Sequence, residues 1–519
     1  MGAAIIKGYQ GNNSASIDSL HVLACMKHFV GYSASMSGRD RTPAWIPDKY
    51  MKEYYLPSFK AAVDAGAHTV MINSGTVNGV PGHVNQALIQ HTLKDDWRFR
   101  GFAVSDWEDF NMLHTVHRVA PDLKTAYEQA FNAGVDMSMV PLSPDYKFYC
   151  ESMIQSVNEG KISLDRLNDA VNRISSTKQA VGLMNKVQPS LNQYTAFGSA
   201  QHKLAAKTAA LESITLLKNN DILPLNASAK FLVAGPTSDN LIFLNGAWTH
   251  TWQGMDTSFN TQGCKTIVQA FQDKYGTNCI FSKGVELFKE REVEQSRFVS
   301  LEDYIKKLDE VETVVLCLGE LPSTEKPGDL RSLNLDSKQL ELAKMAYAKK
   351  KRVILLLVEG RPRIIRDIVD QAAAVVQCYL PGDYGAEALV ELISGEANFS
   401  GKLPYTYPKY DGVMEFYDRP RSVDRSNVGD FNAFNPEWPF GFGLHYGEVS
   451  YEHLKSNEVL SENSPWEISV DVINKGHREI DEVVQLYVGD EIASMVPAGE
   501  QLKRFQKVKI PAGKSVTVH

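Results

Sequence analysis

The sequence predicts an α/β protein followed by a small β-sandwich, and three patterns support this prediction. In the first third of the chain, short apolar strands alternate with helical segments, as in βαβ units that build a parallel sheet. In the middle, continuous apolar runs of strand length end near Gly or Pro, as buried parallel strands do. After Tyr446, apolar and polar residues alternate between turn residues, which is typical of a β-sandwich.

The first region contains four candidate strands, and each is followed by a helical pattern. We expect the strands at residues 23–29, 69–74, 102–107 and 135–140, and the helices near 49–65, 84–94, 123–132 and 164–182. Polar residues stand where these strands end, including His28, Ser74 and Asp106. In (β/α)₈ barrels this end of the strands carries the chemistry, although a barrel needs eight units and only four are visible.

A second α/β region follows a segment that loses periodicity. Residues 185–199 contain Pro189 and Ser190 and predict a linker. Buried strands are then expected at 231–235, 313–319, 353–360 and 374–381, with helices between them such as 337–350. Alternating strands at 466–474 and 482–488 belong to the sandwich, whose pattern stops at His519.

Length and composition exclude several classes of protein. The 519 residues are enough for two or three domains. The net charge of −8 argues against a nucleic-acid partner, and no apolar run reaches the ~18 residues of a membrane span. The first ten residues lack the layout of a signal peptide. Since the sequence has no metal motif, P-loop or dinucleotide fingerprint, we expect neither a metal nor another cofactor.

Six motifs in order resemble glycoside hydrolase family 3 over nearly the whole chain. Each alone has low specificity, but the ordered set has high specificity. The motifs are Lys27-His28-Phe29, the strand and loop at 70–81, GFAVSDW at 101–107, SITLLKNNDILPL at 213–225, GKLP at 401–404 and PFGFGLHY at 439–446.

The resemblance implies a fold for each region. Residues 1–184 would be the C-terminal half of a (β/α)₈ barrel, 185–212 a linker, 213–446 an α/β sandwich, and 447–519 an incomplete fibronectin type III-like β-sandwich. Residues 1–11 resemble an internal family segment that follows an Arg-Trp-Gly-Arg motif, which this chain lacks. We therefore expect a chain truncated at both ends that is inactive and poorly folded when expressed alone.

Retaining glycosidases need two carboxyl groups about 5–5.5 Å apart, a nucleophile and an acid/base. Asp106 ends an apolar strand, where an ionised side chain faces a cleft or a partner. On the residues alone, a helix cap or a buried ion pair remains open for it, whereas the resemblance implies the nucleophile. Glu325 lies in the loop LPSTEKPGDL, which resembles the family's acid/base loop. Glu320 and Asp329 are the alternatives, and a solvated loop charge is the other interpretation of Glu325.

The resemblance also implies residues that bind the sugar. Lys27 and His28 would hydrogen-bond hydroxyl groups of the terminal sugar, since charged donors form strong bonds in a dry site. The neighbouring Arg39, Asp40 and Arg41 either brace the site or pair with one another.

Aromatic rings are expected to bind the apolar faces of sugars. Trp107 follows Asp106 directly, and Trp248 and Trp252 lie in GAWTHTWQG, which resembles a segment of exo-glucanases in this family. Ser74 departs from the family pattern, which often has Tyr there. Part of the substrate preference therefore stays open.

The function implied by the resemblance is that of a retaining, exo-acting β-glucosidase that releases terminal non-reducing β-D-glucosyl residues. Its partner would be a β-glucoside or a β-glucan oligosaccharide, without nucleic acid or membrane, and a homodimer is left open. The full-length form would be secreted, lysosomal or periplasmic. The alternatives are a β-xylosidase, an exo-β-glucanase, or a non-catalytic carbohydrate-binding protein. We also expect a disulfide between Cys264 and Cys279 if the protein is secreted.

Overall fold

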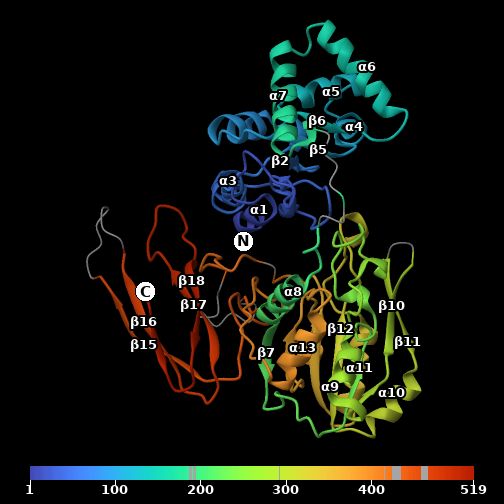
Figure 1. Ribbon diagram of the computed structural model, residues 1–519, viewed down its shortest axis with the longest axis vertical. Helices are drawn as coiled ribbons and strands as arrows, with labels where there is room; N and C mark the ends of the chain where they lie inside the picture. The colour runs from blue at the N-terminus through green and yellow to red at the C-terminus, as the bar shows by residue number, and fades with distance from the viewer. Residues whose placement is uncertain (186–189, 191–193, 291–292, 414, 424–433, 458–465) are drawn as a thin grey trace. The chain divides into compact units, whose positions relative to one another are not determined.

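The computed structural model describes residues 1–185, 190, 194–290, 293–413, 415–423, 434–457 and 466–519 (Figure 1). The chain forms two compact units, Met1–Thr195 and Ala196–His519. Within the described residues, none of the helices combines the length and the apolar character that crossing a membrane requires.

The first unit is built on a parallel sheet with the strand order β1-β2-β5-β6. Its strands are β1 (Cys25–Phe29), β2 (Thr69–Ile72), β5 (Phe102–Trp107) and β6 (Met137–Met139), beside a short pair of β3 (Thr76–Val77) and β4 (Val80–Pro81). The helices are α1 (Gly2–Gln10), α2 (Asp48–Tyr50), α3 (Leu56–Asp64), α4 (Asp109–Thr115), α5 (Leu123–Asn132), α6 (Asp145–Asn158) and α7 (Leu164–Ala180). Short 3₁₀ and π-helical segments are η1 (Tyr32–Ala34), η2 (Met51–Tyr55), η3 (Gly82–Val84), η4 (Ala87–Asp96) and η5 (Leu183–Asn185).

The four predicted strands and the four predicted helical segments of this unit are confirmed, with small shifts at their ends. The apolar side chains of the strands pack against the helices, for example Val70, Ile72 and Ala103 with Phe110 and Leu113 of α4. Helices α1, α4 and α6 were not predicted. The parallel strands place their carboxyl ends at one edge of the sheet, where His28, Ser74 and Asp106 lie.

The second unit contains a six-stranded sheet with the order β7-β14-β13-β12-β8-β9. Only β7 runs antiparallel to its neighbour, and the other pairs are parallel. The strands are β7 (Thr215–Asn219), β8 (Phe231–Ala234), β9 (Cys279–Phe281), β12 (Thr313–Gly319), β13 (Arg352–Val358) and β14 (Ala374–Gln377). Within the predicted linker 185–212, the structure has helix α8 (Ala200–Ser213), while residues 186–189 and 191–193 lie outside the described residues.

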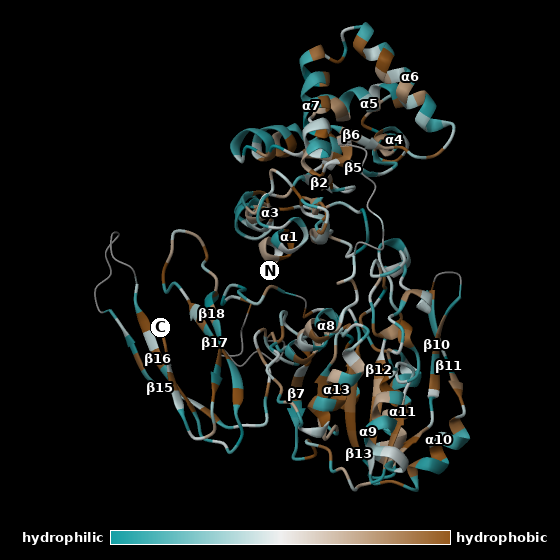
Figure 2. Ribbon diagram, in the orientation of Figure 1, coloured by the Kyte–Doolittle hydropathy of each residue, from teal (hydrophilic) through white to brown (hydrophobic). Residues whose placement is uncertain are grey.

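Helices cover both faces of this sheet, so the unit has three layers here (Figure 1). Successive strand residues point to opposite faces. Val315 and Cys317 of β12 therefore pack with α8, α9 (Ile267–Tyr275) and α13 (Gly385–Ser394). Leu316 and Leu318 pack with α10 (Leu301–Leu308), α11 (Ser337–Ala348) and α12 (Arg366–Val369). Burial on both faces explains the continuous apolar runs, which appear brown in Figure 2.

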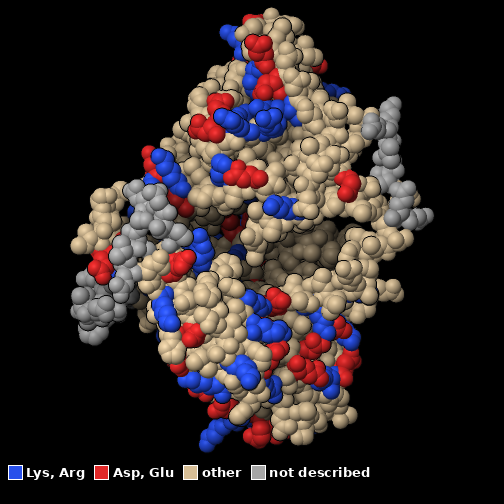
Figure 3. All heavy atoms as spheres, turned by 60° about the vertical axis from the view of Figure 1, so that its left-hand side comes forward, with Lys and Arg blue, Asp and Glu red and all other residues tan. Residues whose placement is uncertain are grey.

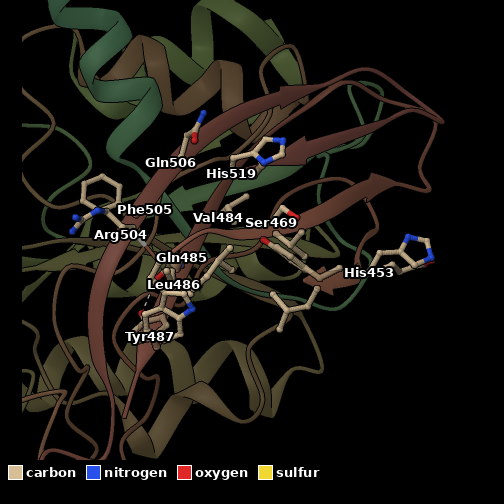
Figure 4. Close-up of a pocket in the computed structure, with 17 residues that line it drawn as sticks. His453, Ser469, Val484, Gln485, Leu486, Tyr487, Arg504, Phe505, Gln506 and His519 are labelled. Carbon is tan, nitrogen blue, oxygen red and sulfur yellow. Dashed lines mark hydrogen bonds between the residues drawn. The ribbon is translucent and has the colours of Figure 1, made fainter. Parts of the chain in front are cut away.

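Two further β elements complete this unit. The antiparallel pair β10 (Gly284–Glu290) and β11 (Val293–Val299) was not predicted. The C-terminal sandwich has one sheet of β15 (Val449–Ser456), β16 (Ile468–Asn474) and β19 (Ser515–Val518), and another of β17 (Ile480–Val488) and β18 (Gln501–Ile510). A cavity of about 740 Å³ lies between these strands and is lined by Val484, Leu486, Phe505 and Val518 among others (Figure 4).

A buried carboxylate links the sandwich to the α/β layers. Glu482 of β17 receives a hydrogen bond from Tyr451 (2.8 Å) and lies 3.3 Å from the Lys402 ammonium. The His445 ring lies 3.5 Å away. Because Lys402 and His445 precede the sandwich in the chain, Glu482 connects the two parts. On the protein surface, acidic and basic side chains are intermingled in small groups on the face that Figure 3 shows.

The expected disulfide is wrong, because Cys264 and Cys279 are both free thiols. Cys264 is only partly buried, in the loop before α9. Cys279 is instead part of the apolar core, and burial raises the pKa of its thiol to about 12.

Gly235, which follows β8, offers a test of the close packing of β8 against β12. Its φ is +99°, and an added Cβ would lie 2.2 Å from the Cys317 carbonyl oxygen. We expect Gly235→Ala to lower the free energy of unfolding by about 3 kcal/mol, from the left-handed backbone and the overlap together. Urea unfolding measures this. Gly412→Ala is the control, since a Cβ there meets nothing within 4 Å, and an equal loss in both variants would contradict the packing.

Candidate active site

Asp106 lies at the carboxyl end of β5, after three buried residues, and donors converge on its carboxylate. The Ser74 hydroxyl donates to Oδ2 (3.0 Å), and the backbone N–H of Trp107 donates to Oδ1 (2.6 Å). The Arg41 guanidinium lies 3.3 Å from Oδ1, and His28 Nε2 lies 3.6 Å from Oδ2. The side chain is largely buried, so these groups fix the direction of both carboxylate oxygens.

A buried network underlies Asp106. The backbone N–H of Asp106 donates to His83 Nε2 (3.4 Å), so the proton of this neutral ring is on Nδ1, 3.6 Å from Asp109 Oδ2. Arg41 donates to Asp109 Oδ1 (3.2 Å) and to the Trp107 carbonyl (3.3 Å). Burial lowers the pKa of His83 to about 3 and raises that of Asp109 to about 7. Sequence reasoning missed both residues.

The other residues predicted in this unit occupy different places. His28 stacks on Tyr32 with 4.5 Å between ring centroids, and burial lowers the His28 pKa to about 4. Lys27 is exposed and lines a hollow of about 270 Å³ between α1 and α3. Trp107 exposes 49% of its surface beside Asp106. His28 and Trp107 therefore share the immediate surroundings of Asp106.

The sequence left open whether Arg39, Asp40 and Arg41 brace the site or pair with one another. The contacts of Asp40 and Arg41 answer this question. Arg41 lies 3.7 Å from Asp40 and also contacts Asp106 and Asp109. Tyr32 donates a hydrogen bond to Asp40. Arg41 thus pairs with its neighbour and braces the carboxylate at the same time.

In the second unit, Glu325 lies in the loop between β12 and the 3₁₀ turn η10 (Lys326–Gly328). Its φ and ψ are +53° and −152°, a combination that essentially only glycine adopts without strain and that costs other residues about 1–3 kcal/mol. The Trp248 indole N–H donates to Glu325 Oε1 (3.3 Å). Trp248 and Trp252 expose 58% and 46% of their surfaces, so both rings are accessible to a ligand. Trp248 and Glu325, predicted separately, are therefore neighbours.

The alternative acid/base Glu320 has a different environment. It is buried and accepts hydrogen bonds from Arg361 Nη2 (2.7 Å), Arg363 Nη1 (2.9 Å) and the backbone N–H groups of Gly360 and Arg361. Burial opposes ionisation, but the two arginines outweigh it and lower the pKa of Glu320. A carboxylate so fully paired is poorly suited to proton donation. Asp329, the other alternative, is exposed.

The strand order explains why Trp248 and Glu325 meet. Strand β8 is followed in the chain by β9 on one side, whereas β12 pairs with β8 on its other side. Ligands of open parallel sheets bind outside the carboxyl ends of strands at such a switch point. The Trp248 loop leaves β8 and the Glu325 loop leaves β12. Among the described residues, no group of three or more His, Cys, Asp or Glu side chains has the arrangement of a metal site.

Family models match three consecutive regions of the chain. The glycosyl hydrolase family 3 N terminal domain matches residues 1–177, its C-terminal domain matches 214–446, and a fibronectin type III-like domain matches 482–519. A beta-xylosidase of Formosa agariphila is 30% identical over the whole chain, which covers 72% of that protein. The chain belongs to glycosyl hydrolase family 3. The resemblance found in the sequence is thereby confirmed.

Other members of the family are similar along the same length. The lysosomal beta glucosidase of Dictyostelium discoideum is 34% identical over 99% of the chain, which spans 64% of the length of that relative. The solved structure of a beta-glucosidase from Listeria innocua in complex with isofagomine is 26% identical, with a TM-score of 0.88. It is matched over 100% of this chain and 72% of its own. The fold of a family 3 N-terminal domain, C-terminal domain and fibronectin-like domain is therefore shared.

The buried pair His83 and Asp109 predicts a pH dependence. The pKa of folded His83 lies below the unfolded value near 6.5, so stability is lost as the pH falls below about 6.5. The pKa of folded Asp109 lies above the unfolded value near 3.9, so stability is lost as the pH rises from about 4 to 7. The two effects oppose each other in the parent chain.

Removal of the Asp109 carboxyl should leave the pH dependence of stability that His83 causes without its opposing effect. We expect the stability of Asp109→Asn to fall more steeply between pH 6.5 and 4 than that of the parent, by up to about 1.4 kcal/mol per pH unit. Urea unfolding at several pH values measures the slope. Asp165→Asn, at an exposed position, is the control. An unchanged slope in Asp109→Asn would show that Asp109 is ionised throughout this range.

Proposed function

We propose that this protein is a retaining, exo-acting β-glucosidase that removes terminal non-reducing β-D-glucosyl residues. The observation that carries the proposal is the Asp106 carboxylate, held by Ser74, Arg41 and the Trp107 N–H at the carboxyl end of a parallel sheet. Relatives named as β-glucosidases support the choice of sugar, and a Listeria innocua β-glucosidase variant was solved with laminaribiose. The substrate class is therefore β-glucosides and β-glucan oligosaccharides.

The chemistry follows from the two carboxyl groups. Asp106 attacks the anomeric carbon and forms a glycosyl-enzyme intermediate, while Glu325 protonates the leaving oxygen. Glu325 then removes a proton from the water that hydrolyses the intermediate, and Asp106 leaves. The neutral His28 ring hydrogen-bonds a sugar hydroxyl, while Trp107, Trp248 and Trp252 contact the apolar faces of the sugars. The sugar contact expected for Lys27 is not part of the proposal, because its side chain lines the separate hollow between α1 and α3.

A β-xylosidase is the second candidate, because the Formosa agariphila relative carries that name. Rates on aryl β-glucoside and aryl β-xyloside separate the two. A faster xyloside reaction would overturn the choice of glucose, and binding of a glucose oligomer without turnover would overturn catalysis. For the location, the relatives named lysosomal and periplasmic support a protein that leaves the cytosol.

Replacement of the nucleophile should abolish most of the activity. In the natural protein that contains this chain, we expect Asp106→Asn to lower kcat by roughly 10⁴-fold or more, since the covalent route is lost. Steady-state kinetics with an aryl β-glucoside measure this, and Asp165→Asn should keep the parent rate. A 2-fluoro-glucoside should label Asp106 in the parent. Labelling of another carboxylate would refute the assignment.

Replacement of the acid/base should depend on the leaving group. A general acid matters most when the leaving group is poor, so Glu325→Ala should lose hydrolysis of cellobiose and keep that of dinitrophenyl glucoside. Azide should raise the rate on the latter substrate. Asp329→Ala, four residues away, is the matched control and should behave like the parent. The same selective profile from Glu320→Ala would assign the role to Glu320 instead.

A further inference from the structure

The strained backbone of Glu325 requires contacts that hold it. A residue in such a conformation persists only where its surroundings over-determine it. The turn after Glu325 contributes one contact, since the Gly328 N–H donates to the Glu325 carbonyl (2.7 Å). Two residues that are distant in the sequence contact the loop on either side of Glu325, in addition to Trp248.

Gln253 contacts the residue immediately before Glu325. Its Nε2 donates to the Thr324 carbonyl (3.1 Å), and its Oε1 accepts from the Thr324 N–H (3.3 Å). The side-chain amide thus pairs with both backbone groups of Thr324, as a neighbouring strand would. Lys289 of β10 donates to the same Oε1 (3.4 Å) and limits the movement of the amide.

The loop that carries Gln253 is itself anchored. Asp383 accepts hydrogen bonds from the side chains of Asn245 (2.8 Å) and Asn260 (2.7 Å) and from the Thr261 N–H (2.7 Å). These bonds fix both ends of the segment that contains Trp248 and Gln253. Gln253 therefore presents its amide from a fixed support.

Arg361 contacts the loop on the other side of Glu325. Its guanidinium donates to the Gly328 carbonyl and to Ser323 Oγ (3.2 Å). The same guanidinium is anchored on Glu320 through Nη2 (2.7 Å) and Nε (3.1 Å). Arg361 thereby connects a buried carboxylate to both ends of the segment 323–328. The structural effect of Glu320 is therefore to anchor Arg361, which is distinct from proton transfer.

We propose that Gln253 and Arg361 are positioning residues that together force Glu325 into its strained backbone conformation and direct its carboxylate toward the Trp248 indole. The part of this proposal that concerns catalysis rests on the proposed role of Glu325 as acid/base. The part that concerns the backbone does not, because it follows from the contacts of the loop alone. The two parts therefore have separate tests.

The backbone part is tested by thermal unfolding of the natural protein that contains this chain. Glycine adopts the conformation of residue 325 without strain, so Glu325→Gly should raise Tm by roughly 2–6 °C. Glu325→Ala keeps a Cβ and should not raise Tm. If Gln253 and Arg361 impose the strain, the gain from Glu325→Gly should shrink to less than half in a Gln253→Ala or an Arg361→Met background.

A matched background controls for general destabilisation. Gln295→Ala removes an exposed glutamine of β11, and the gain from Glu325→Gly should be complete there. Equal gains in all backgrounds, or no gain from Glu325→Gly in the parent, would overturn the proposal. Gln253→Ala alone is sufficient for the test if Arg361→Met does not fold.

The catalytic part is tested by the dependence on the leaving group in the natural protein. Misplacement of a catalytic group by about 1 Å costs on the order of 10²-fold, so Gln253→Ala should lower kcat on cellobiose by that factor and spare dinitrophenyl glucoside. Arg361→Lys keeps the charge and should recover part of the loss seen in Arg361→Met. Strain relief without this selective loss would refute the catalytic role of Glu325 and leave the backbone part supported. Absence of both effects would refute the inference itself.

Discussion

The structure depends on one property of parallel sheets, which is that all strands deliver their carboxyl ends to the same edge. In the second unit, the chain leaves β8 and returns through β9 on one side, and β12 then pairs on the other side. The loops after β8 and β12 therefore start next to each other although about 80 residues separate them. The contact between Trp248 and Glu325 follows from this order of strands. The same property places His28, Ser74 and Asp106 together in the first unit.

Environment divides the carboxyl groups into distinct roles. Asp106 and Asp109 are three residues apart, yet Asp106 is surrounded by donors while burial dominates at Asp109. Glu320 and Glu325 are five residues apart and differ in the same way, because Glu320 is fully paired with arginines and Glu325 is partly exposed on a strained backbone. In the second pair, the buried Glu320 also supports, through Arg361, the loop that carries Glu325.

The sequence predicted those elements whose physical cause is local. The bounds of β12 were correct, because a strand buried on both faces is an apolar run that stops where burial stops. The bounds of β5 were also correct, although its last residue, Trp107, is exposed. Helix α6 was missed although Tyr149, Met153 and Val157 recur at helical spacing and pack against the core, and its fully buried residues are the polar Ser152 and Ser156. The expected disulfide rested on the sequence spacing alone, which does not show that Cys279 is buried in the apolar core.

Site residues, too, were predicted only where a local sequence pattern marks them. Asp106 and Glu325 stand in recognisable motifs, whereas Gln253 and Arg361 act through backbone groups of residues 71 and 33 positions away. No local pattern marks such contacts. His83 illustrates the point further, because its partner is the backbone N–H of Asp106, which any residue type except proline would supply at that position.

The buried carboxylate of Glu482 has a consequence for engineering. Three side chains from different segments converge on it, and two of them, Lys402 and His445, belong to the chain before the sandwich. A sandwich transplanted onto another α/β domain would carry the carboxylate without the Lys402 ammonium, and a buried charge without its partner is strongly unfavourable. The two parts are therefore not interchangeable modules. We expect a chimaera of family members to fold well only if Lys402, His445 and Glu482 all come from the same parent.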